Sequence, residues 1–386
     1  MKDGKTVVVQ LIPWISEGGA ETLVKDYVVN IDKRRFEVYV LTSLISMSTS
    51  SNLRQILDAK VEVLSPYKWG RSNITSVFLR FLGGIFRSTQ QEELKRARFI
   101  KLNIQRLKPD VIHVHMKMLR YIYPIADELG STKLFYTCHS LPQRYFNEKE
   151  EKAEYEAAKY LIKHNDLQMV ALQNSMREEL NQMFGISNTI VLHNCVNIAR
   201  FKDVKERKED IRESLNIPST SLVIGHVGRF TYIKNHKFIV EVFKELVLKC
   251  PDSFLLLVGE GNTKKEVLDL LNAYGLSSKS LVLPARGDIP RMMKAMDVFV
   301  LPSLFEGLPI VAIEAQASGL RTIISNQVTS DIMFSENAIS LDINAGPNAW
   351  VDAIVDGNIK GTAHNSIEDF DVLNVIPAVE HLYMNR

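Results

Sequence analysis

The chain has 386 residues, of which 46% are hydrophobic and 24% are charged, and its formal net charge at pH 7 is +2. This length exceeds what one hydrophobic core usually organises, so two domains are expected. The composition excludes disordered and fibrous proteins, and the balanced charge does not support a nucleic-acid-binding protein. The three cysteines are odd in number and widely spaced. They predict reduced thiols in a cytoplasmic protein, with no metal-ligand spacing.

In the first half, short runs rich in β-branched residues alternate with segments of helical length and period. This alternation predicts a parallel sheet with crossover helices. The expected strands are Thr6–Ile12, Phe36–Leu41, Val61–Leu64, Val111–Val114, Leu134–Thr137, Met169–Ala171 and Ile190–Leu192. A stretch of dense alternating charge follows within residues 198–218, which predicts a solvated linker and a short helix. We therefore expect a first domain over residues 1–197.

The positive charge is concentrated in residues 67–108, which contain ten Lys or Arg residues and two acidic ones. Arg80 and Arg87 share one face of a possible helix in this stretch, which is typical of an amphipathic basic helix. Apolar residues recur at helical spacing on another face, at Phe78, Leu82, Ile85 and Phe86. Two interpretations stay open: peripheral contact with an anionic membrane, at the inner face of the plasma membrane, or ordinary packing on the first sheet with a solvated basic face.

The alternation starts again in the second half, over residues 198–369. The expected strands are Leu222–Val227, Phe254–Val258, Leu281–Leu283, Val298–Leu301 and Thr322–Ile324, and helices are expected to begin near Asn235, Asn262, Ile289 and Pro309. The fold class is therefore α/β, with two Rossmann-like domains. Open sheets of this kind bind ligands beyond the carboxyl ends of their strands. We expect the two domains to face each other across a cleft that holds the chemistry.

One candidate site follows the strand Leu222–Val227, in the segment Gly225-His-Val-Gly228-Arg229-Phe230. A glycine such as Gly228 at a strand end lets the backbone approach a ligand. Arg229 and Lys234 then place two cations close together, as a diphosphate requires. The alternative is an ordinary connection from strand to helix with surface cations.

A second candidate site follows the strand Val298–Leu301, in the segment Pro302-Ser-Leu-Phe-Glu306-Gly-Leu-Pro309. Glu306 is placed in the loop at the carboxyl end of the strand, and the next helix carries Glu314. A carboxylate on a mostly apolar helix face needs hydrogen bonds, which the paired hydroxyls of a ribose would supply. The alternative for Glu314 is a solvated helix position.

Together these residues resemble the retaining glycosyltransferases of family 4, whose fold is called GT-B. The matching motifs in the second half are Gly-x-x-Gly-Arg-Phe, Lys-Asn-His, and Pro-Ser-x-x-Glu-Gly-x-Pro with a second glutamate eight positions after the first. The first half contributes Gly18-Gly-Ala-Glu21, Pro109-Asp-Val-Ile-His-Val-His115, Thr137-Cys-His-Ser140 and the segment 191–197. The resemblance covers nearly the whole chain, and it implies that a C-terminal helix over residues 370–386 packs back on the first domain.

The resemblance also implies a role for each matching residue. Arg229 and Lys234 would hold the diphosphate of the donor and stabilise it as it leaves, without a metal ion or other cofactor. Glu306 would contact the donor sugar and stabilise an oxocarbenium-like transition state. The remaining implied contacts are ribose binding by Glu314, help from the backbone N–H groups near Gly307 and Leu308, diphosphate binding by the backbone of Gly18 and Gly19, and a place for His139 beside the reacting carbon.

The predicted function is the retaining transfer of a hexose or N-acetylhexosamine from a nucleotide-diphosphate sugar, with UDP favoured, to a saccharide acceptor. If residues 67–108 bind a membrane, that acceptor is a lipid-linked saccharide in the synthesis of capsule, exopolysaccharide or lipopolysaccharide. Two alternatives are an epimerase of nucleotide sugars with the same fold and a non-catalytic partner subunit. The Glu306–Glu314 pair favours the transferase over the first, and the retained Arg229 and Lys234 favour it over the second.

An Asp-x-Asp motif and three histidines each have a structural explanation as well as a functional one. Asp369-Phe-Asp371 matches a metal-binding Asp-x-Asp pattern, but acidity at the start of a helix explains it better. His139 has the alternative of a histidine that is satisfied at a strand end, and His113 and His115 are expected to be structural.

Overall fold

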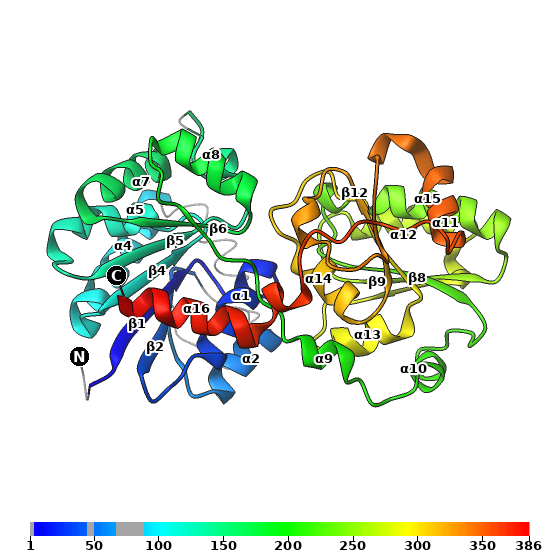
Figure 1. Cartoon of the computed structure of the whole chain (residues 1–386), viewed down its shortest axis with the longest axis horizontal. Coiled ribbons are helices and arrows are strands. Elements are labelled where there is room, and N and C mark those ends of the chain that lie inside the picture. Colours follow the sequence, from blue (N-terminus) through cyan, green and yellow to red (C-terminus); the bar gives the residue numbers. More distant parts are fainter. Residues whose placement is uncertain (1–3, 45–49, 67–88, 148, 386) are drawn as a thin grey trace. The chain divides into compact units, whose positions relative to one another are not determined.

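The structure is a computed structural model that describes residues 4–44, 50–66, 89–147 and 149–385. Over these residues the chain divides into two compact units, Met1–Leu192 with Ile376–Arg386, and His193–Val375. In each unit, helices lie on both faces of a parallel sheet (Figure 1). The strands are therefore buried on both sides, which explains their nearly continuous apolar sequences.

Within the described residues, the sheet of the first unit has seven strands in the order β3-β2-β1-β4-β5-β6-β7. They are β1 (Thr6–Ile12), β2 (Phe36–Thr42), β3 (Glu62–Leu64), β4 (Val111–His115), β5 (Lys133–Thr137), β6 (Gln168–Ala171) and β7 (Ile190–Val191). The helices are α1 (Gly19–Asn30), α2 (Ser51–Asp58), α4 (Thr89–Leu107), α5 (Leu119–Ile122), α6 (Pro142–Tyr145), α7 (Lys152–Asn165) and α8 (Asn174–Phe184). The order reverses between β1 and β4, and ligands bind at such a switch point in open α/β sheets.

The described part of the second unit has a six-stranded sheet in the order β10-β9-β8-β11-β12-β13. Its strands are β8 (Leu222–Val227), β9 (Ser253–Val258), β10 (Ser280–Leu283), β11 (Val298–Leu301), β12 (Arg321–Ser325) and β13 (Ala338–Leu341). The helices are α9 (Ile198–Lys202), α10 (Lys208–Ser214), α11 (His236–Lys249), α12 (Lys264–Ala273), α13 (Ile289–Ala295), α14 (Ile310–Ala317) and α15 (Gly346–Val355). Phe243 and Trp350 are fully buried in its core. The switch point here lies between β8 and β11.

Helix α16 (Val372–Asn385) leaves the second unit, and its residues from Ile376 onward belong to the first unit. Tyr383 is buried, and its hydroxyl accepts a hydrogen bond from Gln10 Nε2 at 2.8 Å. Glu380 accepts a hydrogen bond from the backbone N–H of Asp32 at 2.7 Å and pairs with Arg35 at 3.2 Å. These contacts fix the end of the chain to the first sheet.

The expected strands agree with the structure to within one residue at each end, but β13 was not predicted. This strand, Ala-Ile-Ser-Leu, has one β-branched residue and exposes Ser340, so it lacks the continuous apolar run of the predicted strands. The expected unit boundaries at residues 197 and 370 also differ from the observed ones, at 192 and 376, by five and six residues. Val196 N donates to Phe370 O at 2.8 Å, and this pairing places both crossing segments in the second unit. The helix expected to open at Pro309 begins one residue later, with Pro309 as its N-cap.

Both aspartates of the Asp-x-Asp pattern are engaged in local hydrogen bonds. Asp369 Oδ2 accepts a hydrogen bond from Ser366 N at 2.9 Å, and Asp371 Oδ1 accepts one from Leu373 N at 3.1 Å. The acidity therefore serves the start of a short 3₁₀ helix over Ile367–Phe370 and the start of α16, as expected. The basic helix expected around Arg80 and Arg87 lies outside the described residues, and only α4 of that stretch is described.

Candidate active site

Two loops of the second unit, one after β8 and one after β11, are held together by direct hydrogen bonds. Leu304 N donates to Ile233 O at 2.9 Å, and Asn235 Nδ2 donates to Pro302 O at 3.2 Å. Asn235 adopts a left-handed conformation with φ of 54°, which asparagine tolerates better than most residues. It is also the N-cap of α11. The two loops that carry the motif residues therefore form one surface at the switch point.

This surface brings Lys234 and Glu306 into an ion pair. Lys234 Nζ lies 2.6 Å from Glu306 Oε1, and the two side chains are 18% and 14% exposed. A charge pair at this depth is screened less than one in open water, while both groups stay within reach of a ligand. Arg229 lies in the same loop as Lys234 and is exposed. The structure thus pairs two of the predicted charged residues and places Arg229 on the loop that carries one of them.

Gly228 is required by a histidine that lies beneath it. His226 is fully buried, and its Nδ1 atom donates to Val300 O at 2.8 Å. A side chain at position 228 would bring its Cβ within 2.6 Å of His226 Nε2. Because His226 is fixed by β11, the loop before Arg229 has no room for a larger residue. The N–H group of Gly228 donates to Val258 O at 3.0 Å, so the backbone at this position is fixed to the end of β9.

Helix α14 follows directly after Glu306, and its start is fixed from outside the helix. Asn194 Nδ2 donates to the backbone oxygen of Leu308 at 2.6 Å. Gly307 and Leu308 are buried, and Glu314 is half-buried on the helix. The backbone N–H groups at the start of a helix have no partner within the helix, so this position suits an anionic or hydroxyl ligand.

In the first unit, Gly18 and Gly19 lie at the N-terminus of α1, with Gly18 as the N-cap. Ser16 Oγ donates to Glu21 Oε1 at 2.7 Å, and this fixes the carboxylate beside the helix start. A Cβ at Gly18 would lie 2.3 Å from Glu21 Oε2. The glycine therefore allows the carboxylate to fold back over the first turn, and the predicted ligand site and Glu21 are neighbours.

His139 follows β5 and takes part in a buried hydrogen-bond network. His139 Nε2 lies 2.9 Å from His115 Nδ1, and His115 Nε2 lies 2.7 Å from Gln10 Oε1. His113 is bonded on both sides as well, with Nδ1 at 2.6 Å from the Tyr383 hydroxyl and Nε2 at 2.7 Å from Thr137 Oγ1. We call these residues the histidine network; its members are Gln10, His113, His115, Thr137, His139 and Tyr383.

The three rings of the network are uncharged at neutral pH. Burial lowers the pKa of His113 and of His139 to about 3 each, and it lowers the pKa of His115 in the same direction. Each ring therefore carries one N–H group and one lone pair, and it acts by hydrogen bonding rather than by charge. Burial also raises the pKa of the neighbouring Cys138 thiol, which stays protonated and is a poor nucleophile.

Gln10 and Tyr383 were not among the predicted site residues. Gln10 is a polar residue in the otherwise apolar strand β1, and this interruption is a local signal that the sequence does contain. Tyr383 comes from the last helix, 373 positions away, so no local pattern connects it to Gln10. Asn194, which holds the Leu308 carbonyl group, lies 114 positions from it and was missed for the same reason.

Among the described residues, no group of three or more His, Cys, Asp or Glu side chains could hold a metal ion. No helix in that part of the chain is long and apolar enough to span a membrane.

The chain matches two families of known proteins. Residues 17–200 match the family described as Glycosyltransferase Family 4, and residues 207–341 match Glycosyl transferases group 1. The first match lies mainly in the first unit, the second lies within the second unit, and together they cover most of the chain. The chain belongs to glycosyltransferase family 4.

Several relatives of this glycosyltransferase are similar over different lengths. The putative glycosyltransferase EpsF of Bacillus subtilis is 32% identical over 45% of this chain, and the match spans 46% of EpsF. An Escherichia coli protein, UDP-Gal:alpha-D-GlcNAc-diphosphoundecaprenol alpha-1,3-galactosyltransferase, is 26% identical over 73% of this chain and 77% of its own length. Among solved structures, Anabaena HepE in complex with UDP and glucose has a TM-score of 0.74 and 18% identity, and the match covers 98% of this chain and 99% of HepE. The fold is therefore GT-B.

Proposed function

We propose that this glycosyltransferase moves a hexose or N-acetylhexosamine from a UDP-sugar to a saccharide acceptor with retention of anomeric configuration. The observation that carries the proposal is the ion pair between Lys234 and Glu306, 2.6 Å apart at the switch point of the second sheet. When a sugar–phosphate bond breaks, negative charge grows on the leaving diphosphate and positive charge grows on the sugar. Lys234 can stabilise the negative charge on the diphosphate, and Glu306 can stabilise the positive charge on the sugar.

Each charged residue of the candidate site in the second unit has a proposed task. Arg229 and Lys234 bind the diphosphate and stabilise it as it leaves, so the reaction needs no metal ion. Glu306 stabilises the positive charge at the anomeric carbon, with the backbone at Gly307 and Leu308 beside it. Glu314 accepts hydrogen bonds from the ribose hydroxyls. The named donor of the E. coli relative, UDP-Gal, supports the choice of UDP.

In the first unit, we assign backbone contacts with phosphate oxygens to Gly18 and Gly19. His139 is assigned to the sugar, where an uncharged imidazole can hydrogen-bond to a hydroxyl group. The named acceptor of the E. coli relative is a sugar linked to diphosphoundecaprenol, which supports a lipid-linked saccharide as the acceptor class. The name of another relative, the putative teichuronic acid biosynthesis glycosyltransferase TuaC of Bacillus subtilis, supports a role in the synthesis of cell-surface polysaccharides.

The experiment combines UDP-galactose, UDP-glucose or UDP-N-acetylglucosamine with an N-acetylglucosamine–diphosphate–lipid acceptor and analyses the product by NMR. The expected product from an α-configured donor is α-linked, and its yield is the same in EDTA. A β-linked product contradicts retention, and a requirement for a divalent cation contradicts the role of the two cations. An epimerised donor formed without acceptor would support the isomerase alternative.

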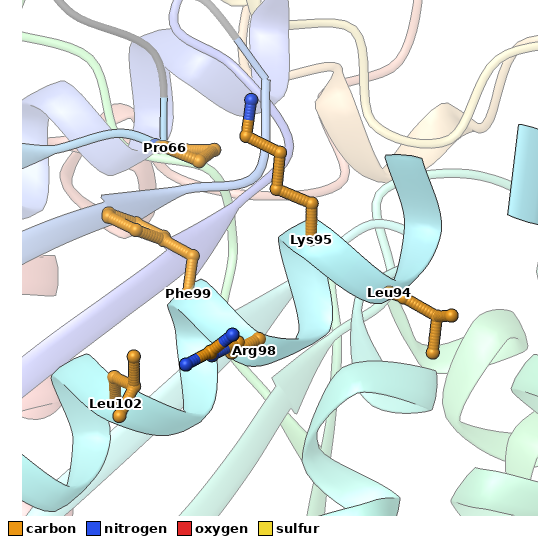
Figure 2. Close-up of a pocket in the computed structure, with 6 residues that line it drawn as sticks. All are labelled: Pro66, Leu94, Lys95, Arg98, Phe99 and Leu102. Atoms are coloured by element: carbon orange, nitrogen blue, oxygen red, sulfur yellow. The ribbon is translucent and has the colours of Figure 1, made fainter. Parts of the chain in front are cut away.

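Peripheral membrane binding is a separate part of the proposal, and it rests on α4. Leu94 and Leu102 of this helix are 64% and 53% exposed, and Arg98 lies on the same face between them. Figure 2 shows these side chains around an open hollow, together with Lys95, Phe99 and Pro66. The opposite face holds the buried Ile100 and Ile104. Exposed leucines beside cations suit an anionic lipid surface, where apolar burial and charge attraction add together.

Flotation with vesicles tests this surface. We expect wild-type protein to bind phosphatidylglycerol vesicles more strongly than phosphatidylcholine vesicles, and Leu94→Ser with Arg98→Gln to weaken that binding severalfold. Leu248→Ser is the matched control, since Leu248 is 75% exposed in the second unit. Unchanged binding by the α4 variant, or equal loss in the control, would contradict the membrane surface on α4.

A further inference from the structure

The histidine network determines where the protons lie. Gln10 Nε2 donates to the Tyr383 hydroxyl, so Gln10 Oε1 is the atom that faces His115 Nε2. A carbonyl oxygen can only accept a hydrogen bond, and His115 must therefore carry its proton on Nε2. Since an uncharged imidazole has one N–H, His115 Nδ1 holds a lone pair.

The position of the His115 proton also determines the position of the His139 proton. The contact between His115 Nδ1 and His139 Nε2 measures 2.9 Å, and one of the two atoms must hold the proton. Because His115 Nδ1 holds a lone pair, His139 Nε2 donates. His139 Nδ1 is then an acceptor, and it makes no hydrogen bond within the described part of the chain.

The far end of the network is also consistent. Tyr383 accepts from Gln10, so its own proton goes to His113 Nδ1 at 2.6 Å. His113 Nε2 then donates to Thr137 Oγ1 at 2.7 Å. With the Gln10 amide in this orientation, every buried ring nitrogen of His113 and His115 has a partner of the correct type.

We propose that Gln10 and Tyr383 act as positioning residues that fix His139, through His115, in the tautomer with its proton on Nε2. The consequence for the substrate rests on the proposed function: the group facing His139 Nδ1 must donate a hydrogen bond. A sugar hydroxyl or an amide N–H meets this requirement. A carboxylate or an ether oxygen does not, so the network selects the class of sugar group that this position accepts.

The network also predicts that the two tautomers change together. In Gln10→Leu, His115 Nε2 loses its acceptor in a buried place, which favours moving the His115 proton to Nδ1. His115 Nδ1 would then donate to His139 Nε2, and His139 would carry its proton on Nδ1. In Gln10→Glu a carboxyl oxygen still accepts from His115, so both tautomers should stay as in wild type.

The experiment is NMR of the full-length protein labelled with ¹⁵N only in histidine, in which protonated and unprotonated ring nitrogens have well-separated shifts. Among the signals of the nine histidines, those of His115 and His139 are assigned by their loss in His115→Gln and His139→Gln. The expected wild-type result is a proton on Nε2 of both rings, retained in Gln10→Glu and moved to Nδ1 of both rings in Gln10→Leu. Thermal unfolding confirms that each variant is folded.

A proton on His139 Nδ1 in wild type, or a wild-type pattern in folded Gln10→Leu, would overturn the proposal. The measurement uses no substrate, so it can fail while the proposed transferase function stands, and the reverse also holds. If Gln10→Leu does not fold, Tyr383→Phe gives a second test: loss of its hydroxyl removes the partner that orients the Gln10 amide, and we expect a mixture of His139 tautomers.

Discussion

The sheets of the two units share one strand order over six strands, but their switch points carry different chemistry. In the first unit, β1 and β4 contribute Gln10, His113 and His115, which are buried and joined by hydrogen bonds. In the second unit, the loops after β8 and β11 carry Arg229, Lys234 and Glu306, which are charged and partly exposed. The same topology therefore supports a neutral network in one unit and a charged one in the other.

The difference predicts that substitutions in the two units affect different properties of the protein. Neutral groups that are fully paired hold one geometry and one set of proton positions, and their loss should reduce stability. A partly exposed ion pair contributes little to stability, because the cost of removing its charges from water offsets much of their attraction, but the charges can bind a charged ligand strongly. Variants in the first unit should therefore affect folding more, and variants in the second unit should affect activity more.

The largest expected effect is on activity in the second unit. Lys234→Ala and Glu306→Gln should each lower kcat by about 10²–10³-fold, as expected for the loss of one preorganised charge at the reacting bond. Both variants should unfold within a few degrees of wild type, because the pair is partly exposed. Steady-state kinetics and thermal unfolding measure the two properties.

Lys265→Ala is the control, since Lys265 is exposed and, within the described ranges, pairs only with Asp269 on α12. An equal loss of kcat in this variant, or full activity in Lys234→Ala, would break the contrast between the two units.

The second prediction concerns pH and the stability of the first unit. Glu154 is buried, and burial raises its pKa from 4.5 to about 7, against the lowering effect of Arg120. The folded protein holds this proton more tightly than the unfolded chain, so stability is lost as the pH rises from 4.5 to about 7. The loss should reach about 3 kcal/mol.

Glu154→Gln should remove this dependence. The free energy of unfolding of the variant, relative to that of wild type, should therefore increase as the pH rises from 4.5 to 8. Urea denaturation across that range measures the difference. Glu156→Gln on the same helix is exposed and should follow wild type at every pH. A Glu154→Gln variant that gains nothing relative to wild type above pH 7 would show that the carboxyl group is accommodated as a charge.

The smallest predicted effect comes from one hydroxyl of the histidine network. Tyr383→Phe keeps the buried ring but leaves Gln10 Nε2 and His113 Nδ1 without a partner. We expect a loss of about 1–3 kcal/mol in the free energy of unfolding, which is the usual cost of buried groups left unpaired. Chemical denaturation measures it, with Tyr232→Phe as the control because Tyr232 is 79% exposed. Equal stability of the two variants would mean that the network does not stabilise the first unit.

The sequence predicted the elements that depend on local pattern. Strand ends were accurate because parallel strands are apolar runs bounded by polar turns, and the loop positions of Arg229, Lys234 and Glu306 follow from those ends. It did not predict β13, where the exposed Ser340 interrupts the apolar run. It also did not predict the pairing of Lys234 with Glu306, 72 positions apart, because contacts between loops depend on the packed sheet.

The histidine network shows the same limit more strongly. His113, His115 and His139 were noticed in the sequence, but their proton positions depend on Gln10 and on Tyr383 from the opposite end of the chain. Gly228 was predicted to open the backbone to a ligand. The structure adds a second reason, since His226 beneath it excludes any side chain.

The central claim is that Arg229 and Lys234 bind the diphosphate of the donor. Calorimetric titration of UDP tests it most directly, with uridine as a second ligand that lacks the phosphates. We expect UDP to bind wild-type protein and Lys265→Ala equally, and to bind the double variant Arg229→Ala, Lys234→Ala at least about tenfold more weakly. The weak binding of uridine should not change in the double variant. UDP binding that is as tight in the double variant as in wild type would contradict the claim.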